Sequence, residues 1–135
     1  LCQRRFELPV MSPLRWPKFW LALWIFGMLL GCYLSLRPGS ATLPLFPHAD
    51  KLIHASGYAI LAVFAVCLFE TRPSRIKALF WLLALGGLIE IAQGLWAVNR
   101  SADVWDLLAD GVGIALAAAI FWRRNALRHI ERLVS

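Results

Sequence analysis

The stretch from Asp50 to Tyr58 places an acid, an amine, an imidazole and a phenol at the start of a long apolar segment. Lys51, His54 and Tyr58 are spaced three and four residues apart, which puts them on one face of a helix. An imidazole between carboxylates can accept and donate a proton near neutral pH. These residue types at this spacing therefore predict acid–base chemistry, provided that carboxylates from elsewhere in the chain reach the imidazole.

Carboxylates with the same helical spacing occur in two later apolar segments. Glu90 and Gln93 are three residues apart, and Asp103, Asp106 and Asp110 are separated by three and four residues. An acid at the centre of a membrane helix costs about 2.5–3.5 kcal/mol on insertion scales. Several such acids in one small protein need a common reason, so we expect them to meet the imidazole.

Four apolar stretches are the elements that must position these side chains, and they comprise residues 19–36, 52–69, 78–98 and 104–122. Each has about the length needed to cross the hydrocarbon core of a bilayer. With 60% apolar and 16% charged residues, the chain is unlike a soluble protein. We expect an all-α, four-transmembrane-helix bundle at residues 15–122, with tails at 1–14 and 123–135. Because Met11 resembles a natural start, residues 1–10 are expected to lie upstream of it.

Lys and Arg are distributed unevenly between the two sides of this bundle. Eleven of the fourteen fall in residues 1–18, 70–77 and 122–135, and the others are Arg37, Lys51 and Arg100. The positive-inside rule then predicts that both termini are cytoplasmic and that loops 37–51 and 99–103 face outward. Orientation accounts for the net charge of +6, so membrane lipids rather than nucleic acid are the expected partners. We expect an integral protein of a bacterial inner membrane, with its oligomeric state left open.

Counting inward from the outer ends of the spans, at about 1.5 Å per residue, gives the polar residues matching depths. The expected rim, middle and floor are, in that order, Lys51, Arg100 and Asp103; His54, Gln93 and Asp106; Tyr58, Glu90 and Asp110. Ser101 is expected to cap the fourth span. The sequence thus predicts one outward-opening pocket between the second, third and fourth spans, with the first span serving only for packing.

The predicted pocket contains two groups of candidate functional residues. The candidate acid–base residues are His54, Glu90, Asp106 and Asp110. The candidate ligand-binding residues are Asp50, Lys51, Tyr58, Gln93, Arg100 and Asp103. No cofactor is evident, and no phosphate-binding glycine loop or nucleophile motif is present. The oxygen-rich set leaves a divalent cation open, although the sequence has no metal-ligand spacing.

The polar pattern resembles that of the VanZ-like membrane proteins. The matching motifs are D-K-x-x-H-x-x-x-Y, E-x-x-Q, and R followed by D-x-x-x-[N] and a Gly, here Asp50, Lys51, His54, Tyr58, Glu90, Gln93, Arg100, Asp106, Asp110 and Gly113. The resemblance covers roughly residues 15–122. Two positions depart from it, since Asp110 stands where the family typically has Asn and Ala117 where it has a small Gly. It implies a link to teicoplanin, because the founding member is associated with low-level resistance to that glycopeptide.

Two functions are compatible with these residues. In the first, the pocket binds or modifies a lipid-linked or glycolipid head group of the cell envelope, with an effect on teicoplanin susceptibility. In the second, the protein is a non-catalytic assembly or accessory subunit whose polar cluster sets helix packing and partner choice. Loss of His54 should abolish an envelope phenotype in the first case and protein accumulation in the second. Whether the protein is an enzyme stays open at this point.

Overall fold

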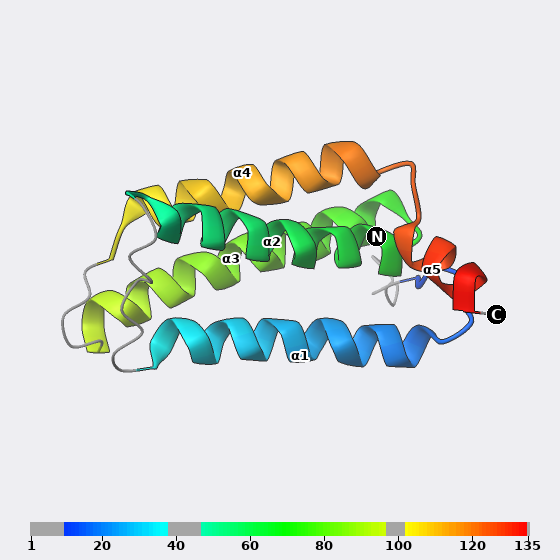
Figure 1. Ribbon diagram of the computed structural model, residues 1–135, viewed down its shortest axis with the longest axis horizontal. Helices are drawn as coiled ribbons and strands as arrows, with labels where there is room; N and C mark the ends of the chain where they lie inside the picture. Colours follow the sequence, from blue (N-terminus) through cyan, green and yellow to red (C-terminus); the bar gives the residue numbers. More distant parts are fainter. Residues whose placement is uncertain (1–9, 38–46, 97–101, 135) are drawn as a thin grey trace, which may run out of the picture.

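The computed structural model describes residues 10–37, 47–96 and 102–134. Within these ranges the chain forms helices and no strand beyond an isolated bridge between Met11 and Phe69 (Figure 1). The helices are α1 (Pro17–Leu36), α2 (Ala49–Leu68), α3 (Arg72–Trp96), α4 (Val104–Phe121) and α5 (Ala126–Val134). The first four are long and apolar enough to cross a membrane, which confirms the predicted all-helical fold with four candidate spans. Their orientation in a membrane stays a prediction.

The boundaries of the helices differ from the apolar stretches that predicted them. Helix α3 begins at Arg72, six residues before the predicted span, and α2 begins at Ala49, three residues before. Hydropathy marks only the segment suited to hydrocarbon, whereas a helix continues into the polar interface as long as its backbone bonds are satisfied. At the start of α3 the Thr71 hydroxyl accepts a hydrogen bond from the Ser74 N–H at 3.4 Å, as a helix cap does.

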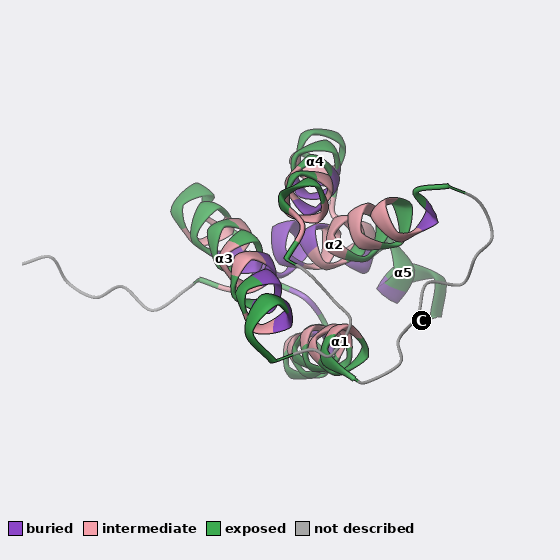
Figure 2. Cartoon of the chain, turned by 90° about the vertical axis from the view of Figure 1, so that its left-hand side faces the viewer, coloured by how far each residue is buried: buried purple, intermediate pink, exposed green. Residues whose placement is uncertain are grey.

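Helix α2 lies at the centre of the bundle and contacts each of the other four helices (Figure 2). Its most extensive contact is with α4. The reason is the small size of the facing residues: Gly113 of α4 lies so close to α2 that a Cβ atom added there would overlap the Ala55 carbonyl oxygen. Ala62 and Ala65 of α2 and Ala117 of α4 are buried as well. Small residues of this kind allow helix backbones to approach closely in a membrane.

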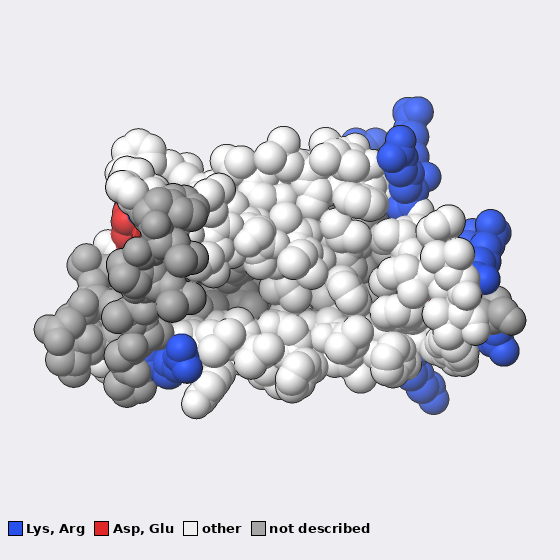
Figure 3. All heavy atoms as spheres, viewed as in Figure 1, with Lys and Arg blue, Asp and Glu red and all other residues white. Residues whose placement is uncertain are grey.

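Large apolar side chains cover the outside of the bundle. Exposed examples include Phe26 and Leu29 on α1, Phe80 on α3 and Leu116 on α4. In Figure 3 the middle of the visible face carries no Lys, Arg, Asp or Glu, and Lys and Arg gather at its right-hand end. So wide an apolar girdle needs hydrocarbon as its solvent. Together with the four long helices, it indicates an integral membrane protein.

The two ends of the bundle differ in their charged residues. We call the end formed by residues 10–16, 69–72 and 122–134 the basic end, and the end formed by residues 47–51 and 102–106 the acidic end. Helix α5, which the hydropathy pattern does not predict, closes the basic end with Leu127 buried in the core. Leu133 and Val134, at the end of α5, are exposed. The predicted 123–135 tail is therefore largely an amphipathic helix.

Candidate functional site

Lys51 connects the beginnings of α2 and α4 at the acidic end. Its Nζ donates to Asp103 Oδ2 at 2.9 Å and to Asp106 Oδ1 at 3.0 Å, and it lies 3.4 Å from Asp50 Oδ2. The second Asp103 oxygen, Oδ1, accepts the Trp105 N–H at 2.9 Å and caps α4. The predicted cap, Ser101, was therefore wrong. The negative charge of an aspartate here also interacts favourably with the positive end of the helix dipole, whereas a serine carries no charge.

The Lys51 ammonium group determines the charge state of the rim. Its hydrogen bond to Asp103 lowers the pKa of that carboxyl the most, and the hydrogen bond from the Trp105 N–H lowers this pKa further. Asp103 is thus ionised at neutral pH and Lys51 has two close carboxylate partners. An ammonium group has three N–H donors, so little of its hydrogen-bonding capacity remains for a ligand.

His54 and Asp110 form the deepest polar pair of the site. His54 Nδ1 lies 3.2 Å from Asp110 Oδ1, and the Asp110 side chain is only 1% exposed. The pair lies one turn from the Gly113–Ala55 contact, so the close approach of α2 and α4 is what brings the two side chains within reach. A carboxylate on Nδ1 fixes the imidazole orientation and leaves Nε2 for proton transfer.

Tyr58 adds a phenol beside this pair. Its hydroxyl oxygen and Asp110 Oδ2 both lie over Gly86 of α3, where an added Cβ would be 3.2 Å and 2.7 Å away, respectively. Any larger residue at position 86 would displace one of them. Gly86 therefore makes room for the polar groups of α2 and α4 against the backbone of α3.

Glu90 and Gln93 extend the site toward α4 and α1. Glu90 Oε2 accepts the Asp103 N–H at 2.8 Å, and Gln93 Nε2 donates to the Ser35 carbonyl at 2.9 Å. Glu90 Oε1 is buried without a hydrogen-bond partner among the described residues. Such an atom is costly unless a donor reaches it. Glu90 is therefore the member of the cluster whose hydrogen bonding is least complete.

These contacts correct the predicted layers. Glu90 was expected on the floor but accepts the Asp103 N–H at the rim, because α3 and α4 are offset along the bundle axis. Asp110, predicted on the floor, is paired with His54, predicted in the middle layer. Lys51, predicted at the rim, donates to Asp106 of the middle layer. Arg100 lies outside the described residues.

A cavity of about 300 Å³ opens beside the polar pair, between α1, α2 and α3. His54 and Tyr58 line it, together with Cys32 and Ser35 of α1. The first span thus forms part of the cavity wall, and its expected packing role stays a prediction. The signal available in the sequence was the glycine pair of α1 at positions 27 and 31, since both glycines line this cavity.

The hydrogen bonds of the described site residues form two groups. Lys51 is bonded to Asp50, Asp103 and Asp106, with Glu90 on the Asp103 N–H. His54 is paired with Asp110, Tyr58 lies beside that pair, and Gln93 bonds to Ser35. Among the described residues, no three His, Cys, Asp or Glu side chains form a group that could hold a metal ion. A bound cation stays a prediction. Comparisons with protein-family models, with curated proteins and with solved structures find no match in any of the three. The resemblance to VanZ-like proteins is consequently supported by the spaced polar residues alone and stays a prediction.

Proposed function

We propose that this protein is an integral membrane protein of the VanZ-like type that binds a glycolipid or lipid-linked head group of the bacterial envelope at its acidic end and modifies it by acid–base catalysis. The observation that carries the proposal is the double position of His54, which is paired with Asp110 and also lines a cavity between three spans. The predicted orientation puts this end at the outer leaflet of the inner membrane.

In this proposal His54 is the proton acceptor and Asp110 is the residue that positions it. Asp110 occupies Nδ1 at 3.2 Å, so Nε2 is the ring nitrogen that a head group in the cavity would meet. When Nε2 takes a proton, the adjacent carboxylate stabilises the resulting imidazolium. Tyr58, on the same wall of the cavity, supplies a hydroxyl that donates to or accepts from the same ligand.

The charges of the site favour a head group rich in hydrogen-bond donors. The described cluster contains one lysine and one histidine against the carboxylates Asp50, Glu90, Asp103, Asp106 and Asp110. Lys51 already has two close carboxylate partners, and Glu90 Oε1 is without a donor among the described residues. Sugar hydroxyl or amino groups complement such a surface better than a phosphate bound by Lys51 would. We therefore favour the sugar of a glycolipid over the phosphate of a lipid-linked precursor as the group recognised.

The test combines a lipid readout with an envelope phenotype. Wild-type protein, His54→Gln and the matched control His48→Gln, at an exposed position just before α2, are purified from bacterial membranes, and the lipids retained by each are identified by mass spectrometry. We expect the wild type and the control to retain a glycolipid that His54→Gln loses or retains unmodified, with a parallel change in teicoplanin susceptibility of the host. Identical lipids and identical susceptibility for all three folded proteins would reject the proposal.

A second candidate is the non-catalytic role, favoured by the number of inter-helix bonds within the cluster. Gln93 joins α3 to α1, Glu90 joins α3 to the start of α4, and Lys51 joins α2 to α4. If packing is the function, His54→Gln lowers the amount of protein in the membrane before any lipid effect appears. The acid–base proposal instead predicts that His54→Gln accumulates normally but is inactive.

A further inference from the structure

The basic end contains a hollow of about 600 Å³ outside the site described above. Its lining residues come from the turn between α4 and α5 and from α5 itself, and they are Arg123, Arg124, Asn125, Arg128, His129 and Arg132. No acidic residue is among them. Guanidinium groups gathered at one hollow repel each other, and an anion between them offsets this repulsion. We call this surface the arginine hollow.

The backbone of the arginine hollow is held in place by side chains from the rest of the bundle. Asn125 Nδ2 donates to the Cys67 carbonyl at 3.1 Å, and Asn125 Oδ1 accepts the Arg128 N–H at 3.0 Å. Arg75 of α3 donates to the Trp122 carbonyl at 2.6 Å. The turn between α4 and α5 is therefore fixed to both α2 and α3. A fixed turn keeps the arginines gathered without the entropy cost of assembling them on binding.

The acidic residue of α5 is unavailable to these arginines. Glu131 is buried, and its carboxylate accepts the Arg15 and Trp16 N–H groups at 2.7 Å and 3.0 Å and the Trp20 indole N–H at 2.7 Å. It thus binds the start of α1. On the other side, Arg128 Nε is buried without a hydrogen-bond partner among the described residues. Arg128 therefore has one buried donor for which the described residues provide no acceptor.

We propose that the arginine hollow binds the phosphate of an anionic phospholipid in the leaflet at the basic end. A phosphate has the charge and the acceptor oxygens that guanidinium groups bind in bidentate fashion. A lipid, rather than free phosphate, is favoured because α5 also exposes Ile130, Leu133 and Val134, which give this end of the bundle apolar surface. Polybasic segments next to a membrane helix attract anionic lipids in this way.

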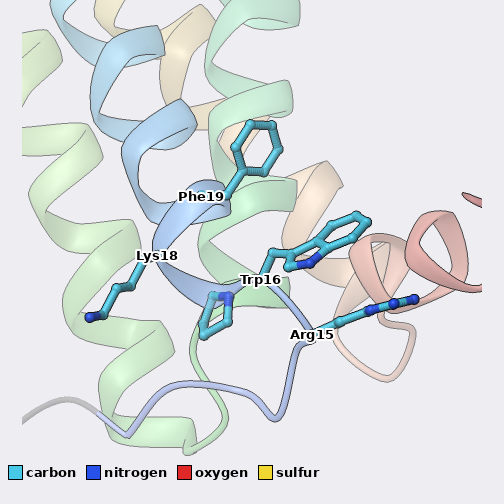
Figure 4. Close-up of a pocket in the computed structure, with 5 residues that line it drawn as sticks. Arg15, Trp16, Lys18 and Phe19 are labelled. Atoms are coloured by element: carbon cyan, nitrogen blue, oxygen red, sulfur yellow. The ribbon is translucent and has the colours of Figure 1, made fainter. Parts of the chain in front are cut away.

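The start of α1 presents the same combination of charge and apolar surface next to α5. Figure 4 shows Arg15 extending toward α5 and Lys18 pointing to the opposite side, with the rings of Trp16 and Phe19 between them. The Arg15 guanidinium lies 5.1 Å from the centre of the Trp16 ring. Tryptophan beside basic residues is typical of the membrane–water interface. This agrees with a lipid head group, and not bulk water, as the neighbour of the arginine hollow.

The experiment measures lipid binding to the purified full chain by native mass spectrometry, with phosphatidylglycerol or phosphatidylcholine of identical acyl chains added to the micelles. We expect the wild type to prefer phosphatidylglycerol by about tenfold or more, since each basic residue near a membrane surface adds a substantial attraction. Arg123→Gln/Arg124→Gln should reduce this preference at least about fivefold. The matched control Arg72→Gln/Lys77→Gln removes the same charge from exposed residues of α3 and should leave the preference within about twofold.

Two results would overturn the inference. Equal losses in the two double variants would show that net charge, not the hollow, attracts the lipid. Displacement of phosphatidylglycerol by millimolar inorganic phosphate would show a site for the free anion. Far-UV circular dichroism confirms that each variant is folded, and the substituted arginines are exposed. The outcome does not depend on His54 chemistry, so it neither supports nor weakens the function proposed for the acidic end.

Discussion

The contact between Gly113 of α4 and Ala55 of α2 yields the sharpest prediction about how the site is held together. Substituting Gly113 by alanine adds one methyl group that overlaps the Ala55 carbonyl oxygen and lies 2.9 Å from its carbonyl carbon. The obstacle is backbone, which cannot rotate away as a side chain can. We therefore expect α2 and α4 to separate, and Asp110 to withdraw from His54, with which it shares a bond of 3.2 Å.

The size of the effect follows from two opposing contributions. Alanine is favoured over glycine in a helix by about 0.5–1 kcal/mol. Overpacking a close contact costs about 1–3 kcal/mol. The matched control is Gly111→Ala on the same helix, where the new methyl group would lie 3.7 Å from Leu83 Cδ1, an ordinary contact. Because both variants gain the same helix propensity, the difference between them isolates the overlap, and we expect Gly113→Ala to be less stable by about 1–3 kcal/mol.

The assay is reversible unfolding in mixed micelles of dodecyl maltoside and sodium dodecyl sulfate, followed by far-UV circular dichroism. Gly111→Ala should unfold at the same or a higher denaturant fraction than the wild type, and Gly113→Ala at a lower one. Equal unfolding midpoints for the two alanine variants would refute the close α2–α4 contact. It would also remove the geometric basis for the His54–Asp110 pair.

Three further predictions concern single polar groups. Burial raises the pKa of Glu131, but three N–H donors lower it by more, so the pKa of Glu131 lies below its usual range. The ionised Glu131 therefore stabilises the fold at neutral pH. This contribution is lost as the pH falls below about 4.3, the pKa of a glutamate in unfolded chains. The gap in thermal midpoint between wild type and Glu131→Gln should close between pH 7 and pH 3, whereas the exposed control Glu70→Gln should show no such gap, and a pH-independent gap would contradict the argument. Glu90→Gln should change the unfolding free energy by less than about 1 kcal/mol, because an amide keeps the acceptor and adds a donor; a larger loss would mean that the carboxylate charge is needed. Lys51→Gln should lower accumulation in the membrane several-fold, as measured by quantitative immunoblot, and accumulation equal to that of Lys18→Gln would exclude a structural role for the ammonium group.

The four spans are predictable from the length and hydropathy of the apolar stretches, and the grouping of polar residues on each span is predictable from helical periodicity. Side chains three and four residues apart share a face whatever the helix packs against, so the spacing alone is enough to group Lys51, His54 and Tyr58. The energetic cost of intramembrane acids then requires a common destination for Asp106 and Asp110. That reasoning needs only the chain and the properties of a bilayer.

The remaining features depend on how the helices are offset, which periodicity does not contain. The depth count assumed that all spans enter from one plane, and it therefore placed Glu90 too deep relative to Asp103. The part of α1 in the cavity wall was missed although Gly27 and Gly31 line it, because small residues in an apolar span predict close helix contact equally well. The Ser35 carbonyl that accepts from Gln93 is backbone and has no sequence signature. Helix α5 escaped notice because a nine-residue amphipathic segment gives a weak hydropathy signal beside long spans.

The two ends of the bundle attract molecules of opposite charge, because carboxylates are in excess at one end and arginines at the other. Five described carboxylates share Lys51 and His54 at the acidic end, so protons, cations or donor groups are attracted there and phosphates are repelled. At the basic end the buried carboxylate of Glu131 is engaged by α1, and the buried Arg128 Nε has no hydrogen-bond partner among the described residues. A bilayer with anionic phospholipid in one leaflet and sugar-bearing head groups in the other suits both ends at once. The charge pattern therefore links the proposed orientation to the proposed ligand, and reversing the protein in the membrane would remove support from both.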